Sequence, residues 1–373
     1  MKKTIALILT IAMAIATLTG CAGTTVVIGE CTCPADAHTA VPAQTEPTVI
    51  EMPTEPAVTE PAMLGSSVKT GLAVITNISE SASATADAAG VAKYDITLAA
   101  VTVDDNGFIH SCVIDSVPAS VNFDAAGTIT SDLTAPISTK NELGENYGMV
   151  AYGGAVAEWD AQVKAVADYA VGKTVEQLKN GDIDMTTGKA KDGSDLASSA
   201  TIYLGGYVSA IEAAVSNAQH LGAMSGDELV LATVNEVSSS TSADAENAGL
   251  AQLDSTITAL TRKNGVISSC YIDAVQAKIA FDNKGTITTD LSAPVQTKNE
   301  LGEGYGMVAW GGAIAEWNEQ AAAYASYITG MTADEVAGIA ISETTKPADG
   351  SDLASSVTIS IGGFQGLIAK AMQ

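Results

Sequence analysis

The chain has 373 residues, and 17 Lys and Arg stand against 43 Asp and Glu, giving a formal net charge of −26 at pH 7. Arg262 is the single arginine, so the sequence lacks the planar guanidinium groups that clamp phosphates and read base edges. We therefore exclude nucleic acid as a partner. Hydrophobic residues at 47% and charged residues at 16% predict that most of the chain folds around buried cores.

The N-terminus has the pattern of a secretory signal. Lys2 and Lys3 precede an apolar run over residues 5–17, which is too short to span a bilayer as a permanent helix. The next four residues, Leu18-Thr19-Gly20-Cys21, resemble a bacterial lipobox. We predict a lipoprotein signal peptide at 1–20, with Cys21 acylated and inserted into a lipid membrane. The alternative is an ordinary signal peptide followed by a chance cysteine.

Residues 21–65 are rich in Thr, Pro, Ala and Glu, and six of the ten prolines lie between Pro34 and Pro61. Such a composition predicts an extended tether between the lipidated cysteine and the folded part. Cys31 and Cys33 lie in this tether and remain unassigned. Cys112 and Cys270 occupy equivalent places in a repeat, where we expect small buried hydrophobes on strands.

The folded part contains an internal duplication. Residues 139–159 and 297–317 agree at 18 of 21 positions with an offset of 158. A second block, Asp-Gly-Ser-Asp-Leu-Ala-Ser-Ser, occurs at 192–199 and again at 349–356. A period of this length predicts two tandem homologous domains, at 66–221 and 222–373.

Each copy has strand patterns first and helix patterns second. We expect strands at 94–103 and 109–114 and a further strand pair on either side of residues 124–127, making at least a four-stranded antiparallel meander. Val156, Trp159, Val163, Val166 and Ala170 follow at steps of three and four, which predicts a helix packed on the sheet. Terminal helices are expected at 202–218 and 359–372. The predicted fold class is α+β, each domain being an antiparallel β-meander followed by helices packed on one face.

The second block continues into a motif that carries chemistry. Asp195-Leu196-Ala197-Ser198-Ser199-Ala200-Thr201 and its copy at 352–358 resemble the flavinylation motif of FMN-binding domains. In that family an Asp is followed three positions later by Ser or Thr, and then by an acceptor Thr or Ser. The resemblance makes Thr201 and Thr358 the acceptors. The accompanying motif residues are Asp195, Ser198, Asp352 and Ser355. Ser199 and Ser356 replace the usual Gly, and Val357 replaces an Ala. The alternative interpretation is that Asp and Ser merely cap helices.

With the lipobox, the tether and the first block, the full chain resembles the flavinylated lipoproteins of extracellular electron transfer, also known as peptide-pheromone-encoding lipoproteins. The resemblance implies two covalent FMN groups, attached by a flavin transferase that uses FAD. It also implies a membrane quinol-linked electron donor, ferric iron or a similar extracellular acceptor, and a location on the extracellular face of the cell membrane. Ferric reductase activity is an open question. The alternatives are a non-redox surface lipoprotein for binding or adhesion, and a pheromone precursor only.

Other candidate chemistry is sparse. His38, His110 and His220 are isolated, and we predict neither a metal site nor a catalytic residue. Trp159 and Trp317 are expected in the core, and Glu158 and Glu316 are expected to face solvent.

Overall fold

The computed structural model describes residue 61 and residues 63–373. The predicted signal peptide, Cys21, the tether cysteines and His38 lie outside the described residues. All the described residues belong to one compact unit. Within the described range, no helix is both long and apolar enough to cross a membrane.

The described chain is a mixed α and β structure whose sheets are antiparallel. Two three-stranded sheets, in the orders β1-β2-β3 and β6-β7-β8, are accompanied by one small two-stranded sheet, β4-β5. The strands are β1 (Lys69–Asn77), β2 (Gly90–Val103), β3 (Ile109–Phe123), β4 (Ile183–Asp184), β5 (Lys189–Ala190), β6 (Glu228–Glu236), β7 (Gly249–Lys263) and β8 (Val266–Phe281).

Helices follow each large sheet in the sequence. The first set is α1 (Lys140–Leu143), η1 (Gly144–Tyr147), α2 (Met149–Gly153), α3 (Trp159–Ala170), α4 (Val175–Asn180), α5 (Asp195–Ser199) and α6 (Gly205–Ser216). The second set is α7 (Lys298–Leu301), η2 (Gly302–Tyr305), α8 (Met307–Gly311), α9 (Trp317–Ile328), α10 (Ala333–Ala337), η3 (Leu353–Ser355) and α11 (Gly362–Ala371). The two predicted terminal helices are thus confirmed as α6 and α11, each shorter than expected.

The expected four-stranded meander is wrong. β3 runs without a break to Phe123, and the segment after the turn at 124–127 pairs with it only through the single bridge between Phe123 and Ile129. The third strand of the sheet is instead β1, which pairs along its whole length with β2. The turn predicted at residues 124–127 is therefore present, but the residues after it do not form a strand.

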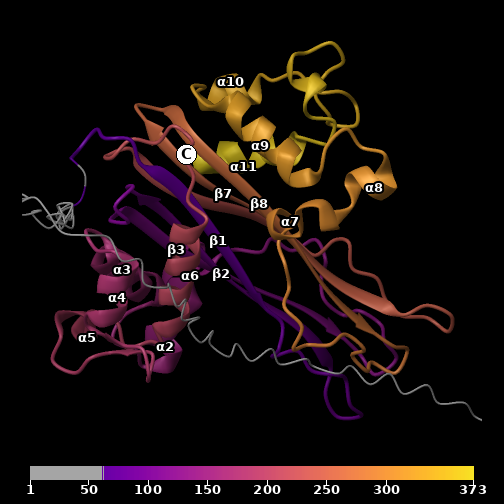
Figure 1. Ribbon diagram of the computed structural model, residues 1–373. Helices are drawn as coiled ribbons and strands as arrows, with labels where there is room; N and C mark the ends of the chain where they lie inside the picture. Colours follow the sequence, from indigo (N-terminus) through magenta and orange to yellow (C-terminus); the bar gives the residue numbers. More distant parts are fainter. Residues whose placement is uncertain (1–60, 62) are drawn as a thin grey trace, which may run out of the picture. The chain divides into compact units, whose positions relative to one another are not determined.

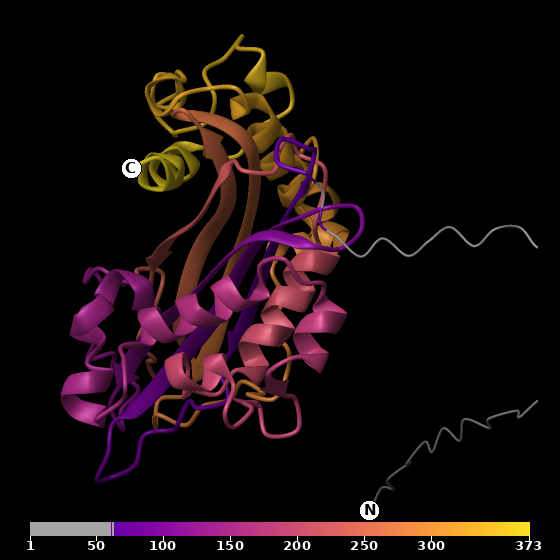
Figure 2. The same cartoon turned by 90° about the vertical axis from the view of Figure 1, so that its left-hand side faces the viewer.

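Each large sheet is covered on both faces. One face of each contributes to a shared apolar core, where the rings of Phe123 and Phe281 stack with their centroids 4.0 Å apart. The other face carries helices, α3 and α6 on the first sheet and α9 and α11 on the second. Figures 1 and 2 show the magenta helices against β1–β3 and the yellow helices against β7 and β8. The helices on these outer faces position the candidate sites.

The two repeats also exchange equivalent hydrogen bonds. Ala84 N–H donates to Gly285 O at 2.7 Å, and Ala243 N–H donates to Gly127 O at 2.8 Å. Ile129 N–H donates to Ser242 Oγ at 2.9 Å, and Ile287 N–H donates to Ser83 Oγ at 2.9 Å. The contact between the repeats is therefore reciprocal.

Candidate functional site

Thr201 is held by a buried glutamine on helix α3. Gln162 is fully buried, and its Oε1 accepts hydrogen bonds from Thr201 N at 2.8 Å and from Thr201 Oγ1 at 3.1 Å. The same side chain donates from Nε2 to Ala157 O at 2.8 Å. Because a buried amide with all its partners is costly to displace, Gln162 fixes the backbone at Thr201 while the threonine itself remains exposed.

The second repeat has the same arrangement. Gln320 is fully buried, and its Oε1 accepts from Thr358 N at 2.7 Å, from Thr358 Oγ1 at 3.2 Å and from Ile359 N at 3.2 Å. Its Nε2 donates to Ala315 O at 2.8 Å. The two motif threonines, Thr201 and Thr358, therefore each contact a glutamine that lies outside the motif.

The serines among the accompanying motif residues, Ser198 and Ser355, bond elsewhere than to Thr201 and Thr358. Asp195, Ser198, Asp352 and Ser355 are all exposed. Ser198 Oγ donates to Asp195 O at 2.7 Å, and Ser355 Oγ donates to Asp352 O at 2.7 Å, so these pairs bond within their own turns.

The alternative, that Asp and Ser of the duplicated block cap helices, holds for one serine of the block and not for the two Asp residues. Asp195 is the first residue of α5, whose N-cap is Ser194, with Ser194 Oγ accepting from Ala197 N. Asp352 stands at the N-cap of η3 but makes no capping bond through its side chain. The cap role belongs to a serine that precedes the motif.

Glu158 and Glu316 do not face solvent as expected. The Glu158 carboxylate accepts from Met149 N at 2.8 Å and from Val150 N at 3.0 Å, and Glu316 does the same for Met307 and Val308. Glu316 is only 5% exposed. The physical reason is that the N-cap residues of α2 and α8 are Gly148 and Gly306, which offer no capping side chain, so the first N–H groups of these helices need a partner from elsewhere.

The first duplicated block fixes the start of α3. Thr139 and Glu142 form a capping box on α1, and Asn141 donates from Nδ2 to Ile114 O at 2.9 Å. Lys140 Nζ lies 5.2 Å from the ring centre of Trp159, the first residue of α3, in a cation–π contact. The block therefore has a structural role that supports the helix carrying Gln162.

A buried aspartate anchors this block in each repeat. Asp273 Oδ1 accepts from Asn299 N at 3.1 Å and from Ala274 N at 2.7 Å. Burial raises the pKa of Asp273 to about 6, although hydrogen bonds from Thr297, Asn299 and Ala274 act in the opposite direction. Burial raises the pKa of Asp115, the equivalent carboxyl in the first repeat.

Large exposed side chains stand close to this region in both repeats. Tyr152 on α2 is 92% exposed and Trp310 on α8 is 83% exposed. The first N–H groups of these two short helices bond Glu158 and Glu316. These glutamates stand at the N-caps of α3 and α9, the helices that carry Gln162 and Gln320. Val156, expected on the buried stripe, is 66% exposed and precedes α3. Both repeats therefore expose an aromatic side chain at the same position of a short helix.

The core predictions for the other tryptophans are confirmed, since Trp159 is 3% exposed and Trp317 is 6% exposed. Trp159 Nε1 donates to Tyr207 Oη at 2.9 Å. Cys112 and Cys270 lie on β3 and β8 as expected, and burial raises the pKa of each thiol to about 12.

Of the two described histidines, His110 bonds across the repeats, whereas His220 bonds within the first repeat. His110 bonds Asp104 and Ser225, and His220 bonds Asp105. Among the described residues, no three His, Cys, Asp or Glu side chains gather as a metal site requires.

The acceptor geometry fits a covalently attached flavin phosphate. Thr201 is an exposed residue whose hydroxyl donates to Gln162, and esterification would remove that hydroxyl proton while the bond from Thr201 N to Gln162 remains available. An exposed aromatic residue belongs to the same helical framework. Compared with protein-family models, with curated proteins and with solved structures, the chain matches none of them.

Proposed function

We propose that this chain is a membrane-anchored extracellular electron carrier that holds one covalent FMN in each repeat, through phosphoesters to Thr201 and Thr358. The observation that carries the proposal is the repeated contact between a motif threonine and a buried glutamine, Gln162 or Gln320. A duplicated helix cap has no need of such a contact, whereas an acceptor must be held in place for a transferase.

The proposal includes the finer domain organisation. Residues 66–221 and 222–373 are tandem homologous FMN-binding domains, each a β-meander with helices on one face. Residues 1–20 are the lipoprotein signal, and Cys21 with the tether to residue 65 anchors the carrier to the cell membrane. The partners are a flavin transferase using FAD, a membrane quinol-linked donor, and ferric iron or a similar acceptor.

The protein's own residues supply position and environment. Gln162 and Gln320 hold the acceptor backbones, and Glu158 and Glu316 hold the short helices that carry Tyr152 and Trp310. These exposed rings offer flat apolar surfaces on which an aromatic group can stack. When bound, FMN supplies one- and two-electron chemistry. A phosphoester also explains how phosphate is retained by a chain with a single arginine.

Intact mass tests the proposal directly. Protein produced with a flavin transferase should carry two FMN groups, and Thr201→Ala or Thr358→Ala should each remove one. Thr201→Ser and Thr358→Ser are the matched controls, because they keep the hydroxyl and should keep the flavin. Two flavins in the double alanine variant would refute the assignment of the acceptors.

A wild-type protein without flavin under these conditions would favour the alternatives, a surface lipoprotein for binding or adhesion, or a pheromone precursor only.

A further inference from the structure

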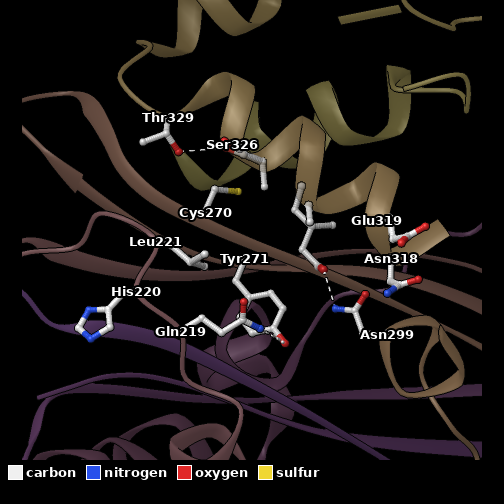
Figure 3. Close-up of a pocket in the computed structure, with 13 residues that line it drawn as sticks. Gln219, His220, Leu221, Cys270, Tyr271, Asn299, Asn318, Glu319, Ser326 and Thr329 are labelled. Atoms are coloured by element: carbon white, nitrogen blue, oxygen red, sulfur yellow. Dashed lines mark hydrogen bonds between the residues drawn. The ribbon is translucent and has the colours of Figure 1, made fainter. Parts of the chain in front are cut away.

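A groove of about 630 Å³ lies between strand β8 and helix α9 of the second repeat, and the segment at 219–221, the end of the first repeat, adds a third wall (Figure 3). It is separate from the acceptor site. Asn318, Ala322 and Ser326 line the groove at steps of four, so they share one face of α9, whereas Gln320 lies on the opposite face with Thr358.

The first repeat has a smaller and more charged counterpart. Its groove of about 340 Å³ is lined on α3 by Asp160, Lys164 and Asp168, and Lys164 Nζ lies 2.6 Å from Asp168 Oδ2. The equivalent residues in the second repeat are Asn318, Ala322 and Ser326, which are shorter or uncharged. The groove of the second repeat therefore lacks these three charges and is the larger of the two, although both volumes lie within the range of typical small-molecule sites, about 300–1,000 Å³.

The amide of Asn318 gives the groove a specific recognition group. Its Oδ1 is shielded from water yet accepts no hydrogen bond from any described residue. Such an orphaned acceptor is unfavourable, and the broad torsion about the Cβ–Cγ bond of Asn allows the amide to turn Oδ1 toward the groove. An amide places an acceptor beside a donor, so it matches a ligand edge with an N–H beside a carbonyl.

The rest of the lining favours a flat and uncharged ligand. Tyr271, Leu221 and Ile272 provide ring and aliphatic surfaces. No Lys or Arg lines the groove, and Glu319 stands exposed at its edge. His220 is already bonded to Asp105. With a net charge of −26 on the whole chain, an anion is disfavoured.

We propose that this groove binds an uncharged planar heterocycle of the pyrimidinedione type, which donates its ring N–H to Asn318 Oδ1 and stacks against Tyr271. Binding is non-covalent and does not depend on FMN at Thr358.

The test uses the full chain with Thr201→Ala and Thr358→Ala, so that no attached flavin interferes, and three probes measured by equilibrium dialysis. Riboflavin carries an uncharged pyrimidinedione ring, 3-methylriboflavin lacks the ring N–H, and FMN adds a phosphate. Riboflavin should bind, and the other two should bind at least tenfold more weakly. Equal binding of all three probes, or no binding of riboflavin, would overturn the proposal.

Matched variants locate the site. Ala322→Lys with Ser326→Asp restores the ion pair of the first repeat at two exposed positions, and should reduce riboflavin affinity at least tenfold. Asn318→Asp, again the residue of the first repeat, should do the same by replacing the amide with a charge. Unchanged affinity in both variants would place any riboflavin elsewhere and overturn the proposal. The covalent flavin assignment is read by mass at Thr201 and Thr358, so it stands or falls independently.

Discussion

The substitution Gln320→Leu tests most directly whether Gln320 holds Thr358 in position. The substitution removes the acceptor for Thr358 N, Thr358 Oγ1 and Ile359 N, and the donor to Ala315 O. The side-chain volume is nearly kept, so the main loss is hydrogen bonding. Each buried group left without a partner costs about 1–3 kcal/mol, and water can reach part of the half-buried Thr358 and Ile359. We expect the free energy of unfolding to fall by about 2–4 kcal/mol.

The same variant should slow attachment at Thr358 alone. Without Gln320 the acceptor backbone is no longer held, while Gln162 and Thr201 in the first repeat are untouched and serve as an internal control. The assay follows FMN addition at each threonine by peptide mass over time, with urea unfolding of the same preparation. Equal attachment rates at the two threonines would refute the positioning role, even if stability fell. Unchanged stability would refute the hydrogen-bond argument itself.

Three further outcomes are expected. Asp273 has a folded-state pKa of about 6, above that of the unfolded chain, so its contribution to stability is fully present at low pH and is lost as pH rises through 6. Relative to Asp273→Asn, the wild-type protein should gain about 1 kcal/mol between pH 7 and pH 5 in urea unfolding, and a parallel pH dependence of the two proteins would contradict the raised pKa. Phe281→Ala should cost about 3–5 kcal/mol by removing the ring stacked on Phe123, whereas a loss below about 1 kcal/mol would mean that the shared core is not packed as described. Trp310→Ala should leave the amount of FMN on Thr358 unchanged but increase its fluorescence, because an indole that stacks on the ring quenches it; Tyr152→Ala, in the other repeat, should leave the Thr358 signal unaltered, and equal fluorescence in the Trp310 variant would exclude stacking.

Local patterns predicted the elements that depend on neighbours in sequence. The spacing of Trp159, Val163 and Val166 placed α3, because a buried helical face repeats every three to four residues. The length of β3 and the presence of β1 could not be predicted with the same security, since a strand is defined by partners distant in sequence.

The sequence motif identified Thr201 and Thr358, but it did not identify the glutamines that hydrogen-bond to them. Gln162 contacts Thr201 across 39 positions, a separation that no local pattern reports. One signal was present: a glutamine lies three residues after Trp159 on the apolar side of α3, and Gln320 repeats it after Trp317. A polar residue on the buried side of two equivalent helices indicates a partner that must also be repeated.

The stacking of Phe123 on Phe281 joins two residues that occupy the same position in the two repeats. At this contact a residue packs against its own counterpart, so a change in one copy alters the packing of the other. Lys164 and Ala322, which occupy equivalent positions on α3 and α9, do not contact each other in this way and differ between the copies. One copy by itself could bury the same ring in this way only by pairing with a second molecule, at a cost set by concentration. With both copies in one chain the contact is intramolecular, so the burial of the two rings does not depend on protein concentration.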